Sequence, residues 1–107
     1  MNAWDIYTWD FPGAGPHPVV IISHPDRIKY KEQLNVLLGS SQRANRTAKV
    51  HEVLLDSADR LDWTTLIKCD LIYAVEESQL KQKRGTVGME CRRQIARKII
   101  QCTALGV

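Results

Sequence analysis

The segment from Trp4 to Arg27 constrains the fold of this chain more than any other. A half-polar stretch, WDIYTWDF, leads through a proline- and glycine-rich turn, PGAGPHP, into the apolar run VVIIS. Because side chains alternate across a strand, positions 4, 6 and 8 face one side and positions 7, 9 and 11 face the other. The apolar run does not alternate, so we expect both of its faces to be covered, one by a core and the other by a helix or a second subunit.

The remaining patterns predict a fold that is mainly β with a C-terminal helix (α+β). Strands are expected near 4–11, 18–23, 34–40, 51–55, 66–75 and 84–87. Residues 24–33 are polar and predict a loop or a short helical turn, whereas Met89–Thr103 has a helical apolar stripe that includes Cys91, Ile95 and Ile99. Five to six strands and a closing helix predict a small SH3-like barrel, which forms a single domain over residues 1–107.

Composition excludes several classes of protein. Three cysteines without paired spacing argue against a disulfide framework and a zinc site, and the three histidines lack metal-ligand spacing, so we expect no metal and no cofactor. No apolar run approaches eighteen residues and the polar N-terminus does not resemble a signal peptide, which predicts a cytoplasmic protein without a membrane span. A core this small favours an oligomer.

The net charge of +3 is modest, but the charges are unevenly placed. Residues 52–62 carry four acids and one arginine, whereas residues 79–98 carry one acid and seven basic residues: Lys81, Lys83, Arg84, Arg92, Arg93, Arg97 and Lys98. Such a basic region suits phosphate or an acidic peptide, and it is equally compatible with ordinary solvated surface charge.

Five segments, in order, resemble the PemK/MazF family of growth-inhibiting toxins. They are DIYTWDFPGAGPHPVVIIS, LNVLLGSSQ, HEVLL, LIKCDLIYAV and KRGTVGMECRRQIARKII, which together span almost the whole chain. The resemblance implies an endoribonuclease that cuts single-stranded RNA, works as a homodimer and is silenced by an acidic antitoxin. Metal-free cleavage by the 2′-hydroxyl of the RNA would need a base, an acid and donors to the phosphate.

Lys68 and Asp70 are the strongest catalytic candidates. They lie two positions apart on an expected strand, so they should share one face, with Ile67, Cys69 and Leu71 on the other. The resemblance implies that Asp70 is the base and that Lys68 stabilises the phosphate. An ordinary surface ion pair is the alternative.

His17 stands where many members of the resembled family have arginine before proline. Histidine titrates near pH 6.5 and could act as an acid or a base, whereas arginine could only donate. His17 could equally lie at the rim of the turn. Arg27, on the following segment, could supply the missing guanidinium.

Polar residues follow the third expected strand. The resemblance implies that Ser41 helps to hold the scissile phosphate, and Ser40 and Gln42 could donate to a phosphate or a base edge, although two serines after a glycine are also ordinary in a turn. Arg43 and Arg46 suit the RNA backbone.

Two other functions remain open. A gyrase-inhibiting toxin of the same fold would act through its terminal helix and would not need Lys68 or Asp70. A non-catalytic nucleic-acid-binding module would need an aromatic groove, for which seven aromatic residues offer little material.

Overall fold

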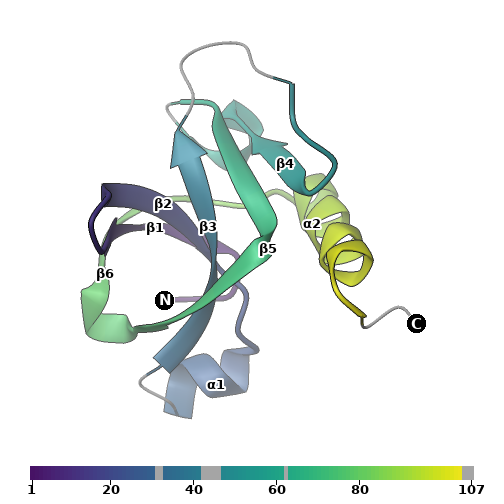
Figure 1. Ribbon diagram of the computed structural model, residues 1–107. Coiled ribbons are helices and arrows are strands. Elements are labelled where there is room, and N and C mark those ends of the chain that lie inside the picture. Colours follow the sequence, from purple (N-terminus) through teal and green to yellow (C-terminus); the bar gives the residue numbers. More distant parts are fainter. Residues whose placement is uncertain (31–32, 42–46, 62, 105–107) are drawn as a thin grey trace.

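The protein folds around one six-stranded sheet with a helix on one side (Figure 1). The computed structural model describes residues 1–30, 33–41, 47–61 and 63–104. The strands are β1 Asp5–Phe11, β2 Gly15–Ile21, β3 Gln33–Ser41, β4 Glu52–Leu55, β5 Thr65–Glu76 and β6 Leu80–Thr86. The helices are α1 Pro25–Tyr30, α2 Met89–Cys102 and the short 3-10 helices η1 Ser57–Asp59 and η2 Glu77–Gln79. The expected sheet with a C-terminal helix is confirmed.

The sheet order, β4-β5-β3-β2-β1-β6, forces the sheet to curl. All five strand pairs are antiparallel. In a flat sheet β5 and β6 would lie four strand spacings, or about 19 Å, apart. They are joined only by the three residues of η2, which span at most about 14 Å. β6 therefore reaches β1 only because the sheet bends into a barrel-like shape whose two edges are β4 and β6.

The curled sheet buries apolar side chains on both faces, as the unbroken run in β2 predicts. The first core lies on the side covered by α2, and Trp4 and Ile22 pack against it. The second core lies on the other face. The first core consists of Ile6, Val20, Leu37, Val53, Leu55, Leu61, Ile67, Cys69, Val87 and Ile95. The second core consists of Trp9, Val19, Ile21, Leu34, Val36, Leu38, Val75 and Leu80.

The last strand is longer than the sequence predicts, because it begins at Leu80 and not at Arg84. Its first half is polar, which hides the strand pattern. Two ion pairs to β1 help to hold it there: Lys81 Nζ lies 3.5 Å from Asp10, and Lys83 Nζ lies 3.4 Å from Asp5. Among described residues, α1 is the short helical turn that residues 24–33 predict.

Asp59 joins the two edges of the sheet. It lies on η1, which follows edge strand β4, and its side chain is fully buried. Its Oδ1 accepts a hydrogen bond of 2.6 Å from the backbone N–H of Gly88, the N-cap of α2 just after edge strand β6. Its Oδ2 accepts from the backbone N–H of Asp56 at 3.1 Å. The carboxylate therefore caps α2 and ties β4 to β6.

All three cysteines are free, as their spacing predicts. Burial, and then the neighbouring Cys102, raise the pKa of the Cys69 thiol from 9.0 to about 12. Burial and the nearby Asp59 raise the pKa of Cys91 to about 11. In the part of the chain that the structure describes, no helix is long and apolar enough to cross a membrane.

Replacing the buried carboxylate should weaken the whole fold. We expect Asp59→Ala to lower the free energy of unfolding by about 2–4 kcal/mol, because two buried N–H groups lose their acceptor. Urea denaturation followed by circular dichroism measures this change. Asp26→Ala removes an exposed carboxylate from α1 and should barely move the midpoint. Equal midpoints for the two variants would contradict the role of Asp59.

The raised pKa of Cys69 predicts a loss of stability at alkaline pH. Below pH 9 the thiol keeps its proton in both states, so it contributes no pH dependence. Between pH 9 and about 12 only the unfolded chain releases the proton, so the free energy of unfolding falls as pH rises. Urea titrations at several pH values should show a shallower fall for Cys69→Ala than for the unaltered protein. Parallel curves would show that the thiol is not the cause.

Candidate active site

His17 is part of β2 and lies directly opposite Trp9 of β1. Its half-buried ring packs near Phe11, with 6.0 Å between the ring centroids, and Phe11 contacts Tyr73 at 5.3 Å. His17 Nδ1 lies 3.0 Å from the carbonyl oxygen of Gly15. A carbonyl oxygen only accepts, so Nδ1 is the donor in this contact.

The two serines at the end of β3 face opposite sides of the sheet. The register of β2 with β3 pairs Val19 with Leu38, and continuing it by two residues places His17 across from Ser40. Opposed residues share a side and successive residues alternate, so Ser40 lies on the side of His17. Ser41 faces the other side and is exposed. The structure therefore brings Ser40, and not Ser41, to the side of His17.

Lys68 lies on the same side of the sheet as Ser40. Ser40 is paired with Leu66, and Lys68 follows Leu66 by two positions in a strand that remains regular against β4. Lys68 is half-buried and sits opposite Glu52, whose side chain is 2% exposed. Oε1 of Glu52 accepts a hydrogen bond of 2.9 Å from the backbone N–H of Lys49. A buried carboxylate thus lies on the strand that flanks the candidate lysine.

Asp70 lies in an irregular part of β5, and this corrects one expectation. Ile67 pairs with Gly39 and Ile72 pairs with Leu37, so residues 68–71 lie opposite a single residue of β3. Ile67 and Cys69 belong to the first core, but Leu71 packs against the second. The expectation that these three share a face is wrong for Leu71, because a bulge inverts the alternation. Asp70 is exposed within the bulge, so alternation from Lys68 does not fix its side.

The structure does not place the other candidate RNA-binding residues beside His17, Ser40 and Lys68. Arg27 is exposed on α1, and its Nε donates to the carbonyl oxygen of Gln33 at 3.3 Å. Gln33 begins β3 and Ser40 lies near its end, so Arg27 lies at the opposite end of the strand (Figure 1). Gln42, Arg43 and Arg46 lie outside the described residues.

Two features of this region were missed by the sequence analysis. One is the aromatic group beside His17, in which Trp9, Phe11 and Tyr73 contact one another with ring centroids 5.3–5.6 Å apart. The other is the buried Glu52. An acid inside the apolar stretch HEVLL was the available signal for it, because a carboxylate is rarely buried without partners.

The arginines of the terminal helix α2 differ in exposure. Arg93 and Arg97 are exposed. Arg92 is half-buried, because its Nε donates to the carbonyl oxygen of Val87 at 2.8 Å and its guanidinium lies 5.8 Å from the ring centroid of Trp4. Among described residues, no group of three or more His, Cys, Asp or Glu side chains could hold a metal ion.

Comparisons with known proteins agree with the fold. A family model described as the PemK-like, MazF-like toxin of type II toxin–antitoxin systems matches residues 2–103. A mycobacterial endoribonuclease in complex with its cognate antitoxin aligns with a TM-score of 0.81 and 20% identity, over 100% of this chain and 96% of that chain. The Mycobacterium tuberculosis toxin MazF-mt6 aligns with a TM-score of 0.77 and 15% identity, over 92% and 94%.

A third structure, of MazE–MazF from Deinococcus radiodurans, aligns with a TM-score of 0.75 and 16% identity, over 100% of this chain and 96% of that chain. The search of curated proteins gave no match. At these identities the solved structures show a shared fold, and the family match extends over nearly the whole sequence.

Gly39 is required for the close approach of β2, β3 and β5 beside the candidate site. A Cβ at this position would lie 2.7 Å from Ile67 Cδ1 and 3.0 Å from the carbonyl oxygen of Pro18. We expect Gly39→Ala to lower the free energy of unfolding by about 1–3 kcal/mol through overpacking.

A double-mutant cycle in urea with Ile67→Val tests the cause. Removing Cδ1 should recover part of the loss but not all of it, because the contact with Pro18 remains. Strictly additive effects would show that the contact with Ile67 is unimportant.

Proposed function

The chain belongs to the PemK-like, MazF-like toxin family of type II toxin–antitoxin systems, and we propose that it is an endoribonuclease toxin that cleaves single-stranded RNA, including mRNA, in the cytoplasm. Cleavage is sequence-preferring and metal-independent, and it inhibits growth. The observation that carries the proposal is the placement of His17, Ser40 and Lys68 on one side of the sheet, beside the bulge that holds Asp70.

The proposed reaction uses the substrate's own 2′-hydroxyl as the nucleophile. A base removes its proton, the 2′-oxygen bonds to the adjacent phosphorus, and the bond from phosphorus to the 5′-oxygen breaks. An acid gives a proton to that 5′-oxygen, so the products end in a 2′,3′-cyclic phosphate and a 5′-hydroxyl. The reaction thus needs one proton acceptor, one proton donor and donors to the phosphate oxygens.

The chain offers a group for each requirement. Asp70 is the proposed base and His17 the proposed acid, which would donate from Nε2 because Nδ1 already donates to Gly15. The Lys68 ammonium and the Ser40 hydroxyl donate to the phosphate, and Lys68 stabilises its charge in the transition state. Ser41 can take the role of Ser40 only if the end of β3 rearranges when RNA binds. Gln42, Arg43 and Arg46, which directly follow β3 in the sequence, remain candidates for contacts with the RNA backbone.

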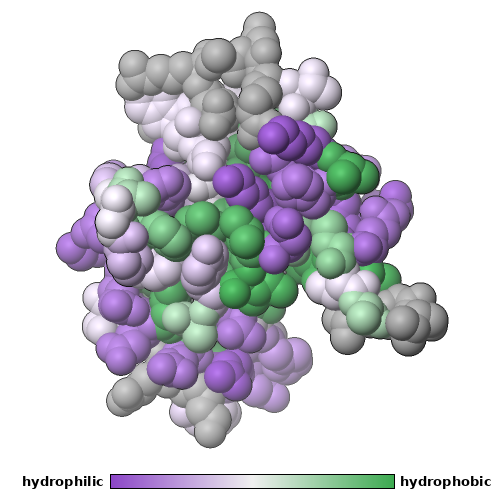
Figure 2. Space-filling view, viewed as in Figure 1, coloured by the Kyte–Doolittle hydropathy of each residue, from purple (hydrophilic) through white to green (hydrophobic). Residues whose placement is uncertain are grey.

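A homodimer and an acidic antitoxin complete the proposal. Figure 2 shows an apolar strip across the face formed by β3 and β5, bordered by polar residues. On β5 the side chain of Ile72 is 44% exposed, which suits burial against a second copy of the chain. One of the similar structures is an endoribonuclease in complex with its cognate antitoxin, and another is of MazE–MazF. The exposed Arg93 and Arg97 on α2 suit an acidic tail.

The test is incubation of the purified protein, in EDTA, with a long single-stranded RNA and with DNA of the same sequence. We expect only RNA to be cut, with 2′,3′-cyclic phosphate ends, because DNA lacks the nucleophile. Asp70→Asn, His17→Gln and Lys68→Met should each lower kcat/KM by about 100-fold or more. Asp26→Asn on α1 is the matched control and should keep full activity. Uncut RNA with the folded protein would refute the proposal and make gyrase inhibition the next function to assay.

The two serines provide a sharper form of the same assay. Because Ser40 shares a side with His17, Ser40→Ala should reduce kcat/KM for RNA more strongly than Ser41→Ala. The reverse order would assign the phosphate contact to Ser41.

A further inference from the structure

We propose that a cavity of about 360 Å³ at the junction of β6, η1 and α2 binds a phosphate group. Its lining contains two arginines and no acid, although it lies next to the buried Asp59. The residues that line it are Ala58, Arg60, Thr86, Val87, Gly88, Met89 and Arg92. Two arginines from different elements therefore line one cavity whose other lining residues are neutral.

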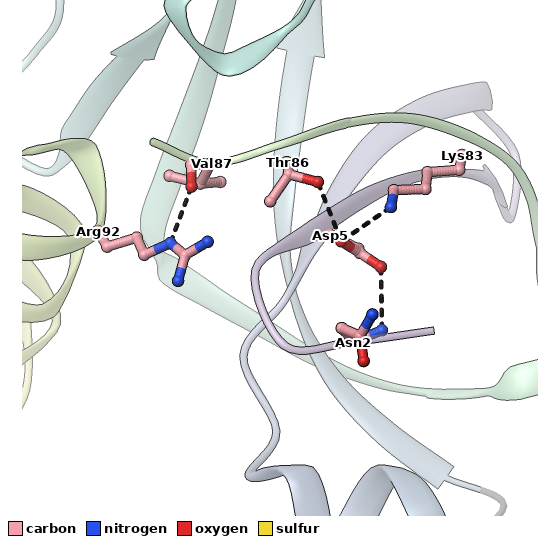
Figure 3. A network of polar contacts seen from close by, with 6 residues as sticks. All are labelled: Asn2, Asp5, Lys83, Thr86, Val87 and Arg92. Atoms are coloured by element: carbon pink, nitrogen blue, oxygen red, sulfur yellow. Dashed lines mark hydrogen bonds and ion pairs between the residues drawn. The ribbon is translucent and has the colours of Figure 1, made fainter. Parts of the chain in front are cut away.

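Arg92 is held in place before any ligand binds. Its Nε donates to the carbonyl oxygen of Val87 at 2.8 Å, and its guanidinium lies 5.8 Å from the ring centroid of Trp4. The bond to Val87 uses Nε (Figure 3), and neither terminal nitrogen of Arg92 has a hydrogen-bond partner among the described residues. A guanidinium fixed in this way loses little freedom when it binds an oxyanion.

Arg60 provides the second cation from a separate element. It is the C-cap of η1, with φ 61, and its backbone N–H donates to the carbonyl oxygen of Ser57 at 3.0 Å. Its side chain is exposed, and within the described ranges it has no acidic partner. Arg60 is therefore free to turn toward an anion in the cavity.

The two buried acids nearby are already satisfied. Asp59 accepts from the backbone N–H groups of Gly88 and Asp56. Asp5 accepts from Thr86 Oγ1 at 3.1 Å, and Lys83 Nζ lies 3.4 Å away (Figure 3). Among the described residues, neither acid forms an ion pair with Arg60 or Arg92.

The arginines, and not the start of α2, carry the proposed site. The backbone N–H of Gly88, the N-cap of α2, donates to Asp59 and is not available to a ligand. Two guanidinium groups match the several oxygens of one phosphate. The volume exceeds that of a phosphate alone, which leaves room for the organic group of a phosphate ester or for a nucleic-acid backbone.

This cavity is separate from the candidate active site. Thr86 pairs with Asp5 at the start of β1, whereas His17 pairs with Trp9, four residues further along that strand. Four residues of strand correspond to about 13 Å. The proposal therefore stands whether or not the chain cleaves RNA.

The experiment is a titration of the ¹⁵N-labelled full chain with inorganic phosphate, with sodium chloride keeping the ionic strength constant. We expect saturable shifts of the Arg92 Nε–H and the Thr86 and Gly88 amide signals. Arg60→Asn, which tolerates a positive φ, and Arg92→Lys, which keeps one charge but loses the fork, should each weaken binding about tenfold. Lys29→Gln, which removes one positive charge from an exposed position of α1 that does not line the cavity, is the matched control and should leave the affinity unchanged.

Two further ligands distinguish the source of the phosphate. A nucleoside 5′-monophosphate that shifts the same signals, when a single-stranded DNA does not, identifies a phosphate-ester site. Shifts with the DNA that depend on Arg60 identify a backbone contact. Shifts that do not saturate, or that saturate equally in Arg60→Asn and Arg92→Lys, would overturn the proposal, and the dispersion of the spectra shows in each case that the variant is folded.

Discussion

The buried carboxylate of Asp59 is the constraint on which the rest of the molecule depends. The sheet has two free edges, and the connection from β5 to β6 bends it so far that these edges approach each other. The single side chain of Asp59 binds the N-cap of α2 just beyond one edge while its backbone belongs to η1 just beyond the other. Gly85 fits this junction because a Cβ there would lie 2.5 Å from the carbonyl oxygen of Asp59. The position of α2 over the first core follows from this contact.

Apolar side chains pack on both faces of the curled sheet, and β5 passes from one core to the other at its bulge. Before the bulge, Ile67 and Cys69 fill the first core; after it, Leu71 packs against the second. The alternation of side chains along β5 inverts in the segment that contains Lys68 and Asp70. These two polar residues therefore lie where the apolar side chains of β5 change from packing in the first core to packing in the second. A bulge of this kind disrupts strand pairing locally.

The sequence predicted the strands and helices correctly where the hydrophobic periodicity was strong. It did not predict the strand bounds and side-chain faces that depend on local charge or on irregular strand pairing. The two faces of β1, the doubly covered β2 and helix α2 follow from alternation and helical spacing. The first half of β6 was missed because its polar residues are held by ion pairs to another strand. The face of Leu71 was assigned wrongly because it depends on the register of β5 with β3. The separation of Arg27 from Ser40 was not anticipated because it depends on which end of β3 each residue lies near.

The distribution of charge shows why a basic run in sequence does not make a basic face. Of the cations between residues 79 and 98, Lys81 and Lys83 pair with acids of β1, and Arg93 lies 3.9 Å from Glu90. The Arg92 guanidinium lies over the ring of Trp4, and Arg92 lines the same cavity as Arg60, which belongs to the acidic stretch 52–62. Folding thus brings two arginines to one cavity from two segments whose average charges are opposite.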